Sequence, residues 1–399
     1  MAGFPTGVVI VGGSAAGLST ADGLREGGYT GAIIVLDEND EPGFDRPMLS
    51  KGMIAAGRDV TPHPLRTPER LAANDITVMS GHAAVGLDID RRHVVTTYGE
   101  AIPFEHVVIA TGVDAKRLRT TSGTVLPALR TLADLDRARE MVTEHGQLTI
   151  IGGGFIGLEV AAALAEAGVA VTVLHSSPEP LARGLGRGAS AWLCEQHRAH
   201  GVRLITGAAV DTIDEVAGGY RITMSDGTTH DAPAILAGVG VAPQTDWLVG
   251  SGVELNGGVL VDEAGRTNVP GVWAAGDVAV TVDTEGNQRC YQHWTRAIEQ
   301  GRTVGLNIAC ADAAAHDGLP YLWTEQFGHT VHVFGLRDPE DAEHVVLGDL
   351  ASGEFVIVHG RGEEFRAVTI SGFPTAIRTY KKLLKQGASL PQALDAARA

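Results

Sequence analysis

The chain has 399 residues and a hydrophobic content of 44%, which is enough for two or three domains with buried cores. Its formal net charge of −17 argues against nucleic acid as a partner, because binding nucleic acid requires a strongly basic surface. No run approaches the roughly 18 apolar residues of a membrane span. No signal-like leader precedes the first candidate strand, so we expect a cytoplasmic protein without a membrane segment.

The cysteines are few and scattered. They are Cys194, Cys290 and Cys310, and no two of them form a C-x-x-C pair. We therefore expect buried, reduced thiols rather than a redox dithiol or a zinc site. The sequence predicts no metal centre in this chain.

The first candidate element lies close to the N-terminus. Residues 7–11 predict a buried strand, and residues 32–36 predict a second strand after an intervening helix. The turn Gly12-Gly-Ser-Ala-Ala-Gly17 has the spacing of the dinucleotide fingerprint, with Ser14 at the middle glycine position. The acidic pair Asp37 and Glu38 at the end of the second strand suits the hydroxyls of a ribose.

The segment that follows carries two cations and a further group of strands. Pro47 is expected to begin a helix with Arg46 and Lys51 near its ends. Residues 76–97 predict short strands, and residues 104–110 predict a buried strand. That strand closes in Thr111 and Gly112, a small hydroxyl and a glycine that would let the backbone approach a ligand.

An amphipathic helix over residues 127–145 leads into a second copy of the first pattern. Gly152, Gly154 and Gly157 follow a predicted strand and precede an alanine-rich helix and another strand. The first glycine permits a tight turn, the second permits approach of a pyrophosphate, and the third permits close packing of the helix. The helix N-terminus then offers free N–H groups to the phosphates. Two such βαβ units predict two dinucleotides, or one dinucleotide and one flavin.

The remaining elements complete the chain. Residues 201–229 predict short strands joined by hairpin turns, and residues 234–240, 259–262 and 271–277 predict further strands. Asp277 is expected at a strand-to-helix junction, where an N-cap is the ordinary role of an aspartate. From residue 320 onward, alternating strands precede a helix over residues 374–386, which indicates another domain.

Several segments resemble the motifs of the flavoprotein ferredoxin reductases of bacterial oxygenase systems, the family of putidaredoxin reductase. They are Val11–Gly17, Arg46–Lys51, Ala110–Gly112, Ile151–Glu159, Ala275–Asp277, Gln292–Ala297 and Trp323–Gln326. The resemblance implies an α/β fold with two Rossmann-like nucleotide-binding domains, as in glutathione reductase, and a C-terminal α+β domain. The implied domains are residues 1–113 with 241–319 for FAD, residues 114–240 for NAD(P), and residues 320–399 at the C-terminus.

The resemblance also implies the cofactors and the residues around them. The expected FAD-binding residues are Gly12, Ser14, Ala15, Ala16, Gly17, Asp37, Glu38, Arg46, Lys51, Ala83, Ala110, Thr111, Gly112, Gly276, Asp277, His293, Trp294 and Trp323. The expected NAD(P)-binding residues are Gly152, Gly154, Phe155, Ile156, Gly157, Glu159, His175, Ser176, Arg183, Gly238 and Gly240. Lys51 and Glu159 are expected to form a catalytic ion pair beside flavin N5.

The implied activity is hydride transfer from a nicotinamide to FAD, followed by single-electron transfer to a [2Fe–2S] ferredoxin that serves a cytochrome P450 or a ring-hydroxylating dioxygenase. His175 stands where NADH-dependent members commonly carry Glu, and Gln292 and Arg296 also depart from the family pattern. NADH remains the expected donor, with NADPH as the alternative. The expected state is a monomer or a homodimer.

Other readings are open at this point. A disulfide or peroxide reductase would need a cysteine near the flavin, and the chain has none before Cys194. A quinone or dye reductase, and a redox-sensing NADH-binding protein such as apoptosis-inducing factor, remain alternatives.

A basic cluster lies on the predicted C-terminal helix. Arg378 and Lys382, and Lys381 and Lys385, are i,i+4 pairs of like charge, so the cations share a face. We expect this face to steer an acidic ferredoxin, together with Arg289, Arg296 and Arg302. An ordinary solvated helix face is the alternative.

Overall fold

The computed structural model describes residues 4–41, 43–56, 60, 62–311, 314–316 and 318–397. The chain divides into two compact units. The first comprises Met1–Asp45, Pro62–Asp114 and Ala242–Gly318, and the second comprises Arg46–Thr61, Ala115–Val241 and Leu319–Ala399. The segment 46–61 and the C-terminal part therefore share a unit with the second fingerprint, and the expected three-domain division stays a prediction.

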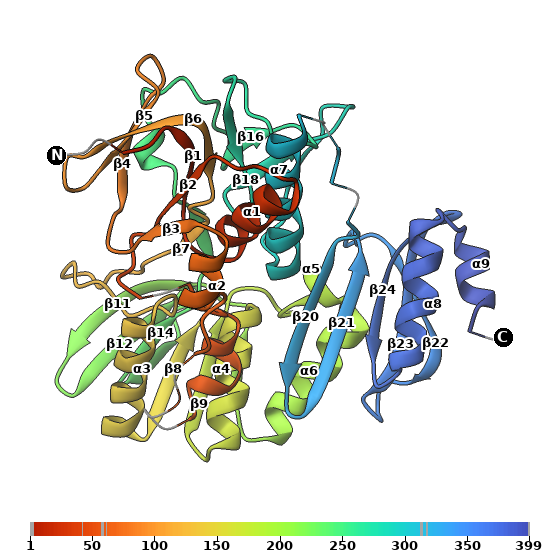
Figure 1. The fold of residues 1–399 in the computed structure, drawn as a ribbon. Helices are drawn as coiled ribbons and strands as arrows, with labels where there is room; N and C mark the ends of the chain where they lie inside the picture. The colour runs from red at the N-terminus through yellow and green to blue at the C-terminus, as the bar shows by residue number, and fades with distance from the viewer. Residues whose placement is uncertain are drawn as a thin grey trace. The chain divides into compact units, whose positions relative to one another are not determined.

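The first unit is built on a sheet with the strand order β3-β2-β1-β6-β5-β4, with β17 added beside β6 (Figure 1). Strands β1, β2, β3, β6 and β17 run parallel, whereas β5 pairs antiparallel with β6 and β4 pairs antiparallel with β5. The strands are β1 (Gly7–Val11), β2 (Ala32–Leu36), β3 (Ile76–Met79), β4 (Ala84–Asp88), β5 (His93–Thr96), β6 (Ala101–Ile109) and β17 (Val272–Ala274).

Two helices cover one face of this sheet. In β1, Val8 and Ile10 pack with α1 (Ala15–Glu26) and α7 (Trp294–Cys310), whereas Val9 and Val11 belong to the core on the opposite face. This alternation is the two-residue period of a strand that is buried on both sides. Helix α1 begins directly at the turn that carries the first fingerprint, and α7 packs closely on it, since a Cβ on Gly301 would meet the backbone of Ala16.

Smaller elements complete the first unit. A sheet of β16 (Val259–Val261), β18 (Ala279–Val282) and β19 (Gln288–Cys290) accompanies α2 (Pro68–Ala73) and η2 (Asp246–Leu248). Strands β7 (Val113–Ala115) and β15 (Val241–Pro243) pair with each other. Asp277 lies in the turn between β17 and β18, and α7 begins only at Trp294. The expected strand-to-helix junction at Asp277 is therefore wrong, and Asp277 caps none of the described helices.

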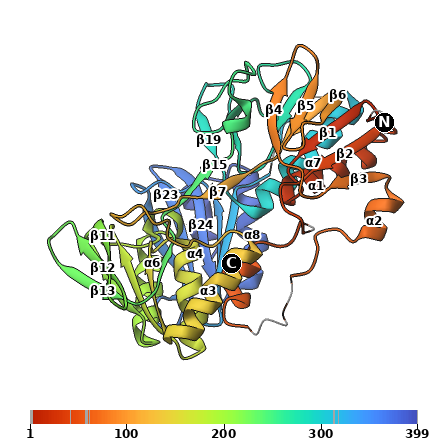
Figure 2. The ribbon, with the colours of Figure 1, turned by 90° about the vertical axis from the view of Figure 1, so that its left-hand side faces the viewer.

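The second unit contains the other parallel sheet, in the order β10-β9-β8-β14. Its strands are β8 (Gln147–Ile151), β9 (Ala170–His175), β10 (Arg203–Thr206) and β14 (Ile235–Ala237). The helices are α3 (Leu132–His145), α4 (Phe155–Glu166), α5 (Ala182–Leu185) and α6 (Arg187–Ala199), and an antiparallel sheet holds β11 (Val210–Val216), β12 (Gly219–Met224) and β13 (Thr229–Ala232). Figure 2 labels the helices α3, α4 and α6 and the antiparallel strands β11, β12 and β13 of this unit.

Two helix starts differ from the sequence prediction. The helix expected from residue 127 begins at Leu132, because Thr131 and Asp134 form a reciprocal capping box there. The helix expected from Pro47 is the short π-helical segment η1 (Leu49–Met53).

The C-terminal part is an antiparallel sheet in the order β20-β21-β24-β23-β22, with α8 (Pro374–Lys385) and α9 (Leu390–Asp395) on one face (Figure 1). In β23, Val356 and Val358 pack with these helices, and Phe355 and Ile357 pack with α6. The strands are β20 (Tyr321–Gln326), β21 (His329–Gly335), β22 (Ala342–Asp349), β23 (Glu354–Arg361) and β24 (Glu364–Ser371). Among the described residues, no helix is both long and apolar enough to cross a bilayer.

Candidate functional site

The first fingerprint forms a sharp turn at the carboxyl end of β1. Gly12 has φ +116°, a region that L side chains rarely adopt, and a Cβ there would lie 2.6 Å from the carbonyl carbon of Ala110. A Cβ on Gly17 would lie 3.0 Å from the carbonyl carbon of Gly12, so the helix packs directly on the turn. Ser14 is the N-cap of α1 and has ordinary extended angles, which explains why this position accepts a residue other than glycine.

The second fingerprint repeats this geometry in the second unit. Gly152 has φ +117°, and a Cβ there would lie 2.5 Å from the carbonyl carbon of Gly238. Gly157 packs on the turn as Gly17 does, with the Gly152 carbonyl carbon 3.2 Å from its notional Cβ. Gly154, the N-cap of α4, has extended angles and no atom within 4 Å of its notional Cβ. The protein's own packing therefore does not require a glycine at residue 154.

Both helix N-termini are suited to an anion. Neither α1 nor α4 has an acidic residue in its first turn, and neither N-cap residue makes a side-chain capping bond. The first N–H groups of a helix have no partner within the helix and carry the positive end of its dipole. The pyrophosphate of a dinucleotide fits this pair of sites.

Asp37 and His175 occupy equivalent places in the two repeats. Asp37 is buried, and its Oδ1 accepts hydrogen bonds from the backbone N–H and the side-chain amide of Asn39. Its Oδ2 lies directly against Gly13 of the first turn. Glu38 is exposed, and its Oε1 lies 3.4 Å from the amide nitrogen of Gln244.

His175, the last residue of β9, is half-buried and lies against Gly153 of the second turn. Its Nδ1 accepts a hydrogen bond from the Gly153 N–H at 3.1 Å. Burial lowers the pKa of His175, which favours the neutral ring. The neutral ring then keeps Nε2–H as its remaining donor, so a donor stands where a carboxylate would be an acceptor. Ser176 and Arg183 are exposed nearby in sequence.

The other expected FAD residues of the first unit lie mainly at strand ends. Ala110, Thr111 and Gly112 follow β6, and Gly276 and Asp277 follow β17, so they gather at the carboxyl edge of the parallel strands. The Thr111 hydroxyl donates to the Gln244 carbonyl at 2.8 Å, and the Gly276 N–H donates to Gln300. The expected residues Ala15 and Ala16 open α1, Ala83 immediately precedes β4, His293 is the N-cap of α7, and Trp294 is its first residue.

The predicted ion pair is confirmed within the second unit. Lys51 Nζ lies 2.5 Å from Glu159 Oε1, and Glu159 is only 5% exposed. Glu159 also accepts from the hydroxyls of Ser50 and Thr324, at 2.6 and 2.7 Å. The ammonium of Lys51 lies 5.6 Å from the centre of the Trp323 ring. That this pair lies beside flavin N5 stays a prediction.

Sequence reasoning did not assign Ser50 and Thr324 to this cluster. Both residues lie inside motifs of the family resemblance, but the motifs do not predict which groups the two hydroxyls contact. Ser50 is 109 residues from Glu159 in sequence and Thr324 is 165 residues away, so no spacing rule could pair them. Arg46 lies four residues before Ser50 in the chain and belongs to the same unit.

The remaining NAD(P) residues surround the second turn. The Gly238 N–H donates to the Ile151 carbonyl at 2.7 Å, and the Gly240 carbonyl accepts from the Lys116 N–H at 2.9 Å. Phe155 packs against the apolar residues of α5 and α6, whereas Ile156 is 43% exposed. An exposed isoleucine at the first turn of a helix is available to a ligand.

Two expectations about other side chains fail. Cys194 is buried as expected, but Cys290 and Cys310 are exposed, although all three are free thiols. Arg296 is only 8% exposed and lies over the Tyr291 ring at 4.6 Å, so it offers no docking surface. The described part of the chain contains no cluster of acidic, cysteine and histidine side chains that could hold a metal.

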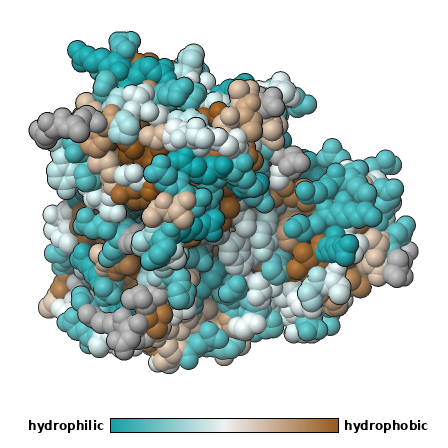
Figure 3. All heavy atoms as spheres, viewed as in Figure 1, coloured by the Kyte–Doolittle hydropathy of each residue, from teal (hydrophilic) through white to brown (hydrophobic). Residues whose placement is uncertain are grey.

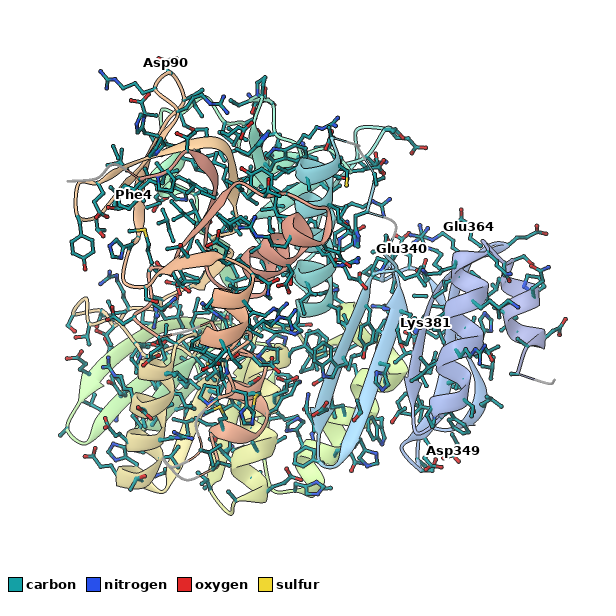
Figure 4. All side chains as sticks on the ribbon, in the orientation of Figure 1. Phe4, Asp90, Glu340, Asp349, Glu364 and Lys381 are labelled. Atoms are coloured by element: carbon teal, nitrogen blue, oxygen red, sulfur yellow. The ribbon has the colours of Figure 1, made fainter. Side chains whose placement is uncertain are left out.

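The cations of α8 are exposed, as predicted. Arg378, Lys381, Lys382 and Lys385 all face solvent on the helix, in a part of the surface that is largely hydrophilic (Figure 3). Lys381 projects from α8, with Nζ 5.3 Å from the Phe334 ring centre (Figure 4). In the first unit, Arg302 is paired with both oxygens of Glu26, and Arg289 lies 3.8 Å from Asp283.

Comparison with known proteins agrees with this arrangement. The family model described as pyridine nucleotide-disulphide oxidoreductase matches residues 6–301, and the model described as reductase C-terminal matches residues 321–399. The chain is 30% identical over 391 residues to putidaredoxin reductase CamA of Pseudomonas putida, covering 94% of this chain and 91% of the relative. It is 32% identical over 368 residues to the benzene 1,2-dioxygenase system ferredoxin–NAD(+) reductase subunit of Pseudomonas putida, covering 90% and 88%.

A solved structure shares the whole fold. The covalent putidaredoxin reductase–putidaredoxin complex matches with a TM-score of 0.89 at 28% identity, covering 98% of this chain and 96% of that one. The two fingerprints and these matches define an FAD-dependent oxidoreductase that uses FAD and NAD(H). The chain belongs to the flavoprotein ferredoxin reductase family that includes putidaredoxin reductase.

Proposed function

We propose that this protein takes a hydride from NADH and passes electrons one at a time to a [2Fe–2S] ferredoxin, which serves a cytochrome P450 or a ring-hydroxylating dioxygenase. The observation that carries the proposal is the likeness to ferredoxin reductases along both the nucleotide-binding part and the C-terminal part of the chain. FAD, when bound, supplies the chemistry that couples a two-electron donor to a one-electron acceptor.

The residues of the first unit would hold FAD. The N–H groups at the start of α1 bind its pyrophosphate, and the close turn at Gly12 brings the backbone near it. Asp37 and Glu38 are the acceptors for ribose hydroxyls, and Thr111, Gly276, Asp277, His293 and Trp294 complete the site.

The residues of the second unit would hold the nicotinamide nucleotide and tune the reaction. The α4 N-terminus and Gly154 bind the second pyrophosphate, and His175 faces the adenosine ribose. Lys51, held by Glu159, would place a positive charge near flavin N5 and would favour electron density there. Bound FAD would supply the hydride acceptor, so no side chain of this protein is required as a general base.

The exposed cations of α8 would dock the acidic ferredoxin. Weak electron-transfer complexes are small and depend on electrostatic steering, which an exposed stripe of cations supplies. A monomeric or homodimeric state and a cytoplasmic location also remain predictions.

Purification followed by an acceptor screen tests the proposal. The protein should carry non-covalent flavin with bands at about 380 and 450 nm, as oxidised flavins do. With NADH it should reduce a [2Fe–2S] ferredoxin faster than it reduces a quinone. Fast quinone or dye reduction with no ferredoxin turnover would overturn the proposed acceptor, and slow transfer with a nucleotide-driven change in oligomeric state would indicate a redox sensor.

A further inference from the structure

A buried chain of hydrogen bonds extends from Glu159 into the second unit. The Thr324 hydroxyl donates to Glu159 Oε1 at 2.7 Å, and the Gln326 amide nitrogen donates to the Thr324 oxygen at 2.8 Å. His197 Nε2 lies 2.7 Å from the Gln326 carbonyl oxygen. None of these four residues is more than 5% exposed. The chain thus connects α4, β20 and α6 out of contact with solvent.

Local structure places the links. Thr324 and Gln326 are two residues apart on β20, so they share the buried face while Glu325 between them is exposed. The ring of His197 lies edge-on to Phe327 at 4.8 Å, which restrains its orientation. Each hydrogen-bonding side chain of this chain is therefore held in place by the helix or strand on which it lies.

The direction of the chain follows from the chemistry of its members. An ionised Glu159 only accepts, so the single hydroxyl proton of Thr324 must point to it. The Thr324 oxygen must then accept from the Gln326 amide N–H, which turns the Gln326 carbonyl toward His197. That carbonyl needs a donor, so His197 carries its proton on Nε2. All three protons point toward Glu159.

The surroundings of the other ring nitrogen, Nδ1, are consistent with a proton on Nε2. Within the described residues, His197 Nδ1 is buried and has no hydrogen-bond partner. A buried acceptor without a partner is tolerated better than a buried N–H without one. Burial also lowers the pKa of His197 to about 4, so the ring is neutral at neutral pH.

We infer that Thr324, Gln326 and His197 are positioning residues that hold the Glu159 carboxylate in a fixed orientation as the acceptor for Lys51. The functional part of this inference rests on the proposed function, since it takes Lys51 to act on the flavin. The amide of Gln326 interrupts any path for protons, so the chain orients the ion pair and does not conduct protons. Lys51 is thereby held in place through groups that themselves touch no substrate.

The experiment compares three threonine variants. Thr324→Val removes the link to Glu159, and Thr324→Ser keeps the hydroxyl. Thr369→Val is the matched control, because Thr369 is equally buried, lies 2.8 Å from a buried histidine, His359, and donates to the Leu185 carbonyl. Both valine variants lose a pair of buried hydrogen bonds, so a stability effect alone would appear in both.

The first readout is independent of activity. Imidazole ¹⁵N NMR of histidine-labelled protein, with His197→Asn to assign the signal, should show His197 as a single Nε2–H tautomer in the wild type. Thr324→Val should convert it to a mixture or to the Nδ1–H form, and Thr324→Ser and Thr369→Val should leave it unchanged. If the His197 tautomer is the same in Thr324→Val as in the wild type, the inference is overturned.

The second readout is the rate at which NADH reduces the bound flavin. Thr324→Val should slow it about tenfold, the scale of one hydrogen bond to a charged group, with little change in NADH affinity. Thr324→Ser and Thr369→Val should stay within about twofold of the wild type. A wild-type rate in Thr324→Val would also refute the inference. If that variant does not fold, Gln326→Met breaks the next link and takes its place in both readouts.

The two proposals can fail separately. A wild-type protein that NADH does not reduce refutes the proposed function, while the His197 tautomer still tests the hydrogen-bond chain. Normal reduction of the wild type with unaltered reduction of the chain-breaking variant refutes the inference alone.

Discussion

Replacement by alanine should affect different properties of the protein at residues 152 and 154. Gly152 makes the turn after β8, where φ is +117° and a Cβ would lie 2.5 Å from the Gly238 carbonyl carbon. Gly154 has extended angles and open space around its notional Cβ. We therefore expect Gly152→Ala to impair folding and Gly154→Ala to impair nucleotide binding.

The geometry sets the size of each effect. A strained backbone costs about 1–3 kcal/mol, and the clash adds to it, so Gly152→Ala should lose about 3 kcal/mol or more. That corresponds to a melting temperature roughly 6–12 °C lower, at about 2–4 °C per kcal/mol for a unit of this size. Gly154→Ala only changes an N-cap residue, which costs about 1 kcal/mol or less. A methyl group that displaces one charged phosphate contact should weaken NADH binding by about tenfold or more.

Thermal melting and NADH titration of the two purified variants make the test. Both should retain the flavin as far as they fold, because the first fingerprint is unaltered. If Gly154→Ala binds NADH as tightly as the wild type, then the backbone at residue 154 does not approach the pyrophosphate. If Gly152→Ala melts at the wild-type temperature, then the account of the turn is incorrect.

Four further predictions concern three single side chains and one pair of lysines. Replacing Lys51 with Met should slow flavin reduction by NADH at least tenfold in stopped flow while the affinity for NADH changes little, because the cation paired with Glu159 is lost; an unchanged rate would exclude the pair from the reaction. Replacing His175 with Glu should raise the NADH-to-NADPH ratio of kcat/KM about tenfold, because a carboxylate repels a 2′-phosphate; an unchanged ratio would show that this residue does not read the ribose. Reversing Lys381 and Lys382 to Glu should raise the KM for ferredoxin and weaken its salt dependence while dye reduction is retained; ferredoxin turnover that ignores both salt and the reversal would exclude α8 as the docking surface. Burial lowers the pKa of His197 to about 4, so between about pH 6.5 and pH 4 the unfolded chain binds a proton that the folded chain does not. This group should therefore remove about 3 kcal/mol from the free energy of unfolding as the pH falls through that window. Urea unfolding of His197→Asn should show a smaller fall in stability with falling pH, and an equal fall would contradict the lowered pKa of His197.

The parts of the fold that local chemistry dictates were predictable from sequence. The turns at Gly12 and Gly152 require glycine, because they combine positive φ with a neighbouring carbonyl group. Alternating and continuous apolar runs located most strands, and the cations of α8 fell on an exposed helix as their spacing indicated. The ion pair of Lys51 with Glu159 came from the family resemblance rather than from any spacing rule.

The parts that depend on distant contacts were not predictable. Asp277 was placed at a helix start because strand, glycine and aspartate are a common N-terminal signal, yet the chain continues into β18. Arg296 was grouped with Arg289 and Arg302 as a cation that would steer a ferredoxin, but it is buried over Tyr291. The hydrogen bonds that link Glu159 to His197 join α4, β20 and α6, and no pattern in a single sequence predicts that these three elements come together.

The most direct test of the central claim is a single-turnover reaction of the reduced protein. The flavin is reduced anaerobically with one equivalent of NADH, and the product is mixed with excess oxidised [2Fe–2S] ferredoxin in a stopped-flow instrument. The account predicts that the flavin is reoxidised as two ferredoxin molecules are reduced per flavin, with a rate that falls as ionic strength rises. Flavin that stays reduced in the presence of ferredoxin, yet is reoxidised rapidly by a quinone, would contradict the account.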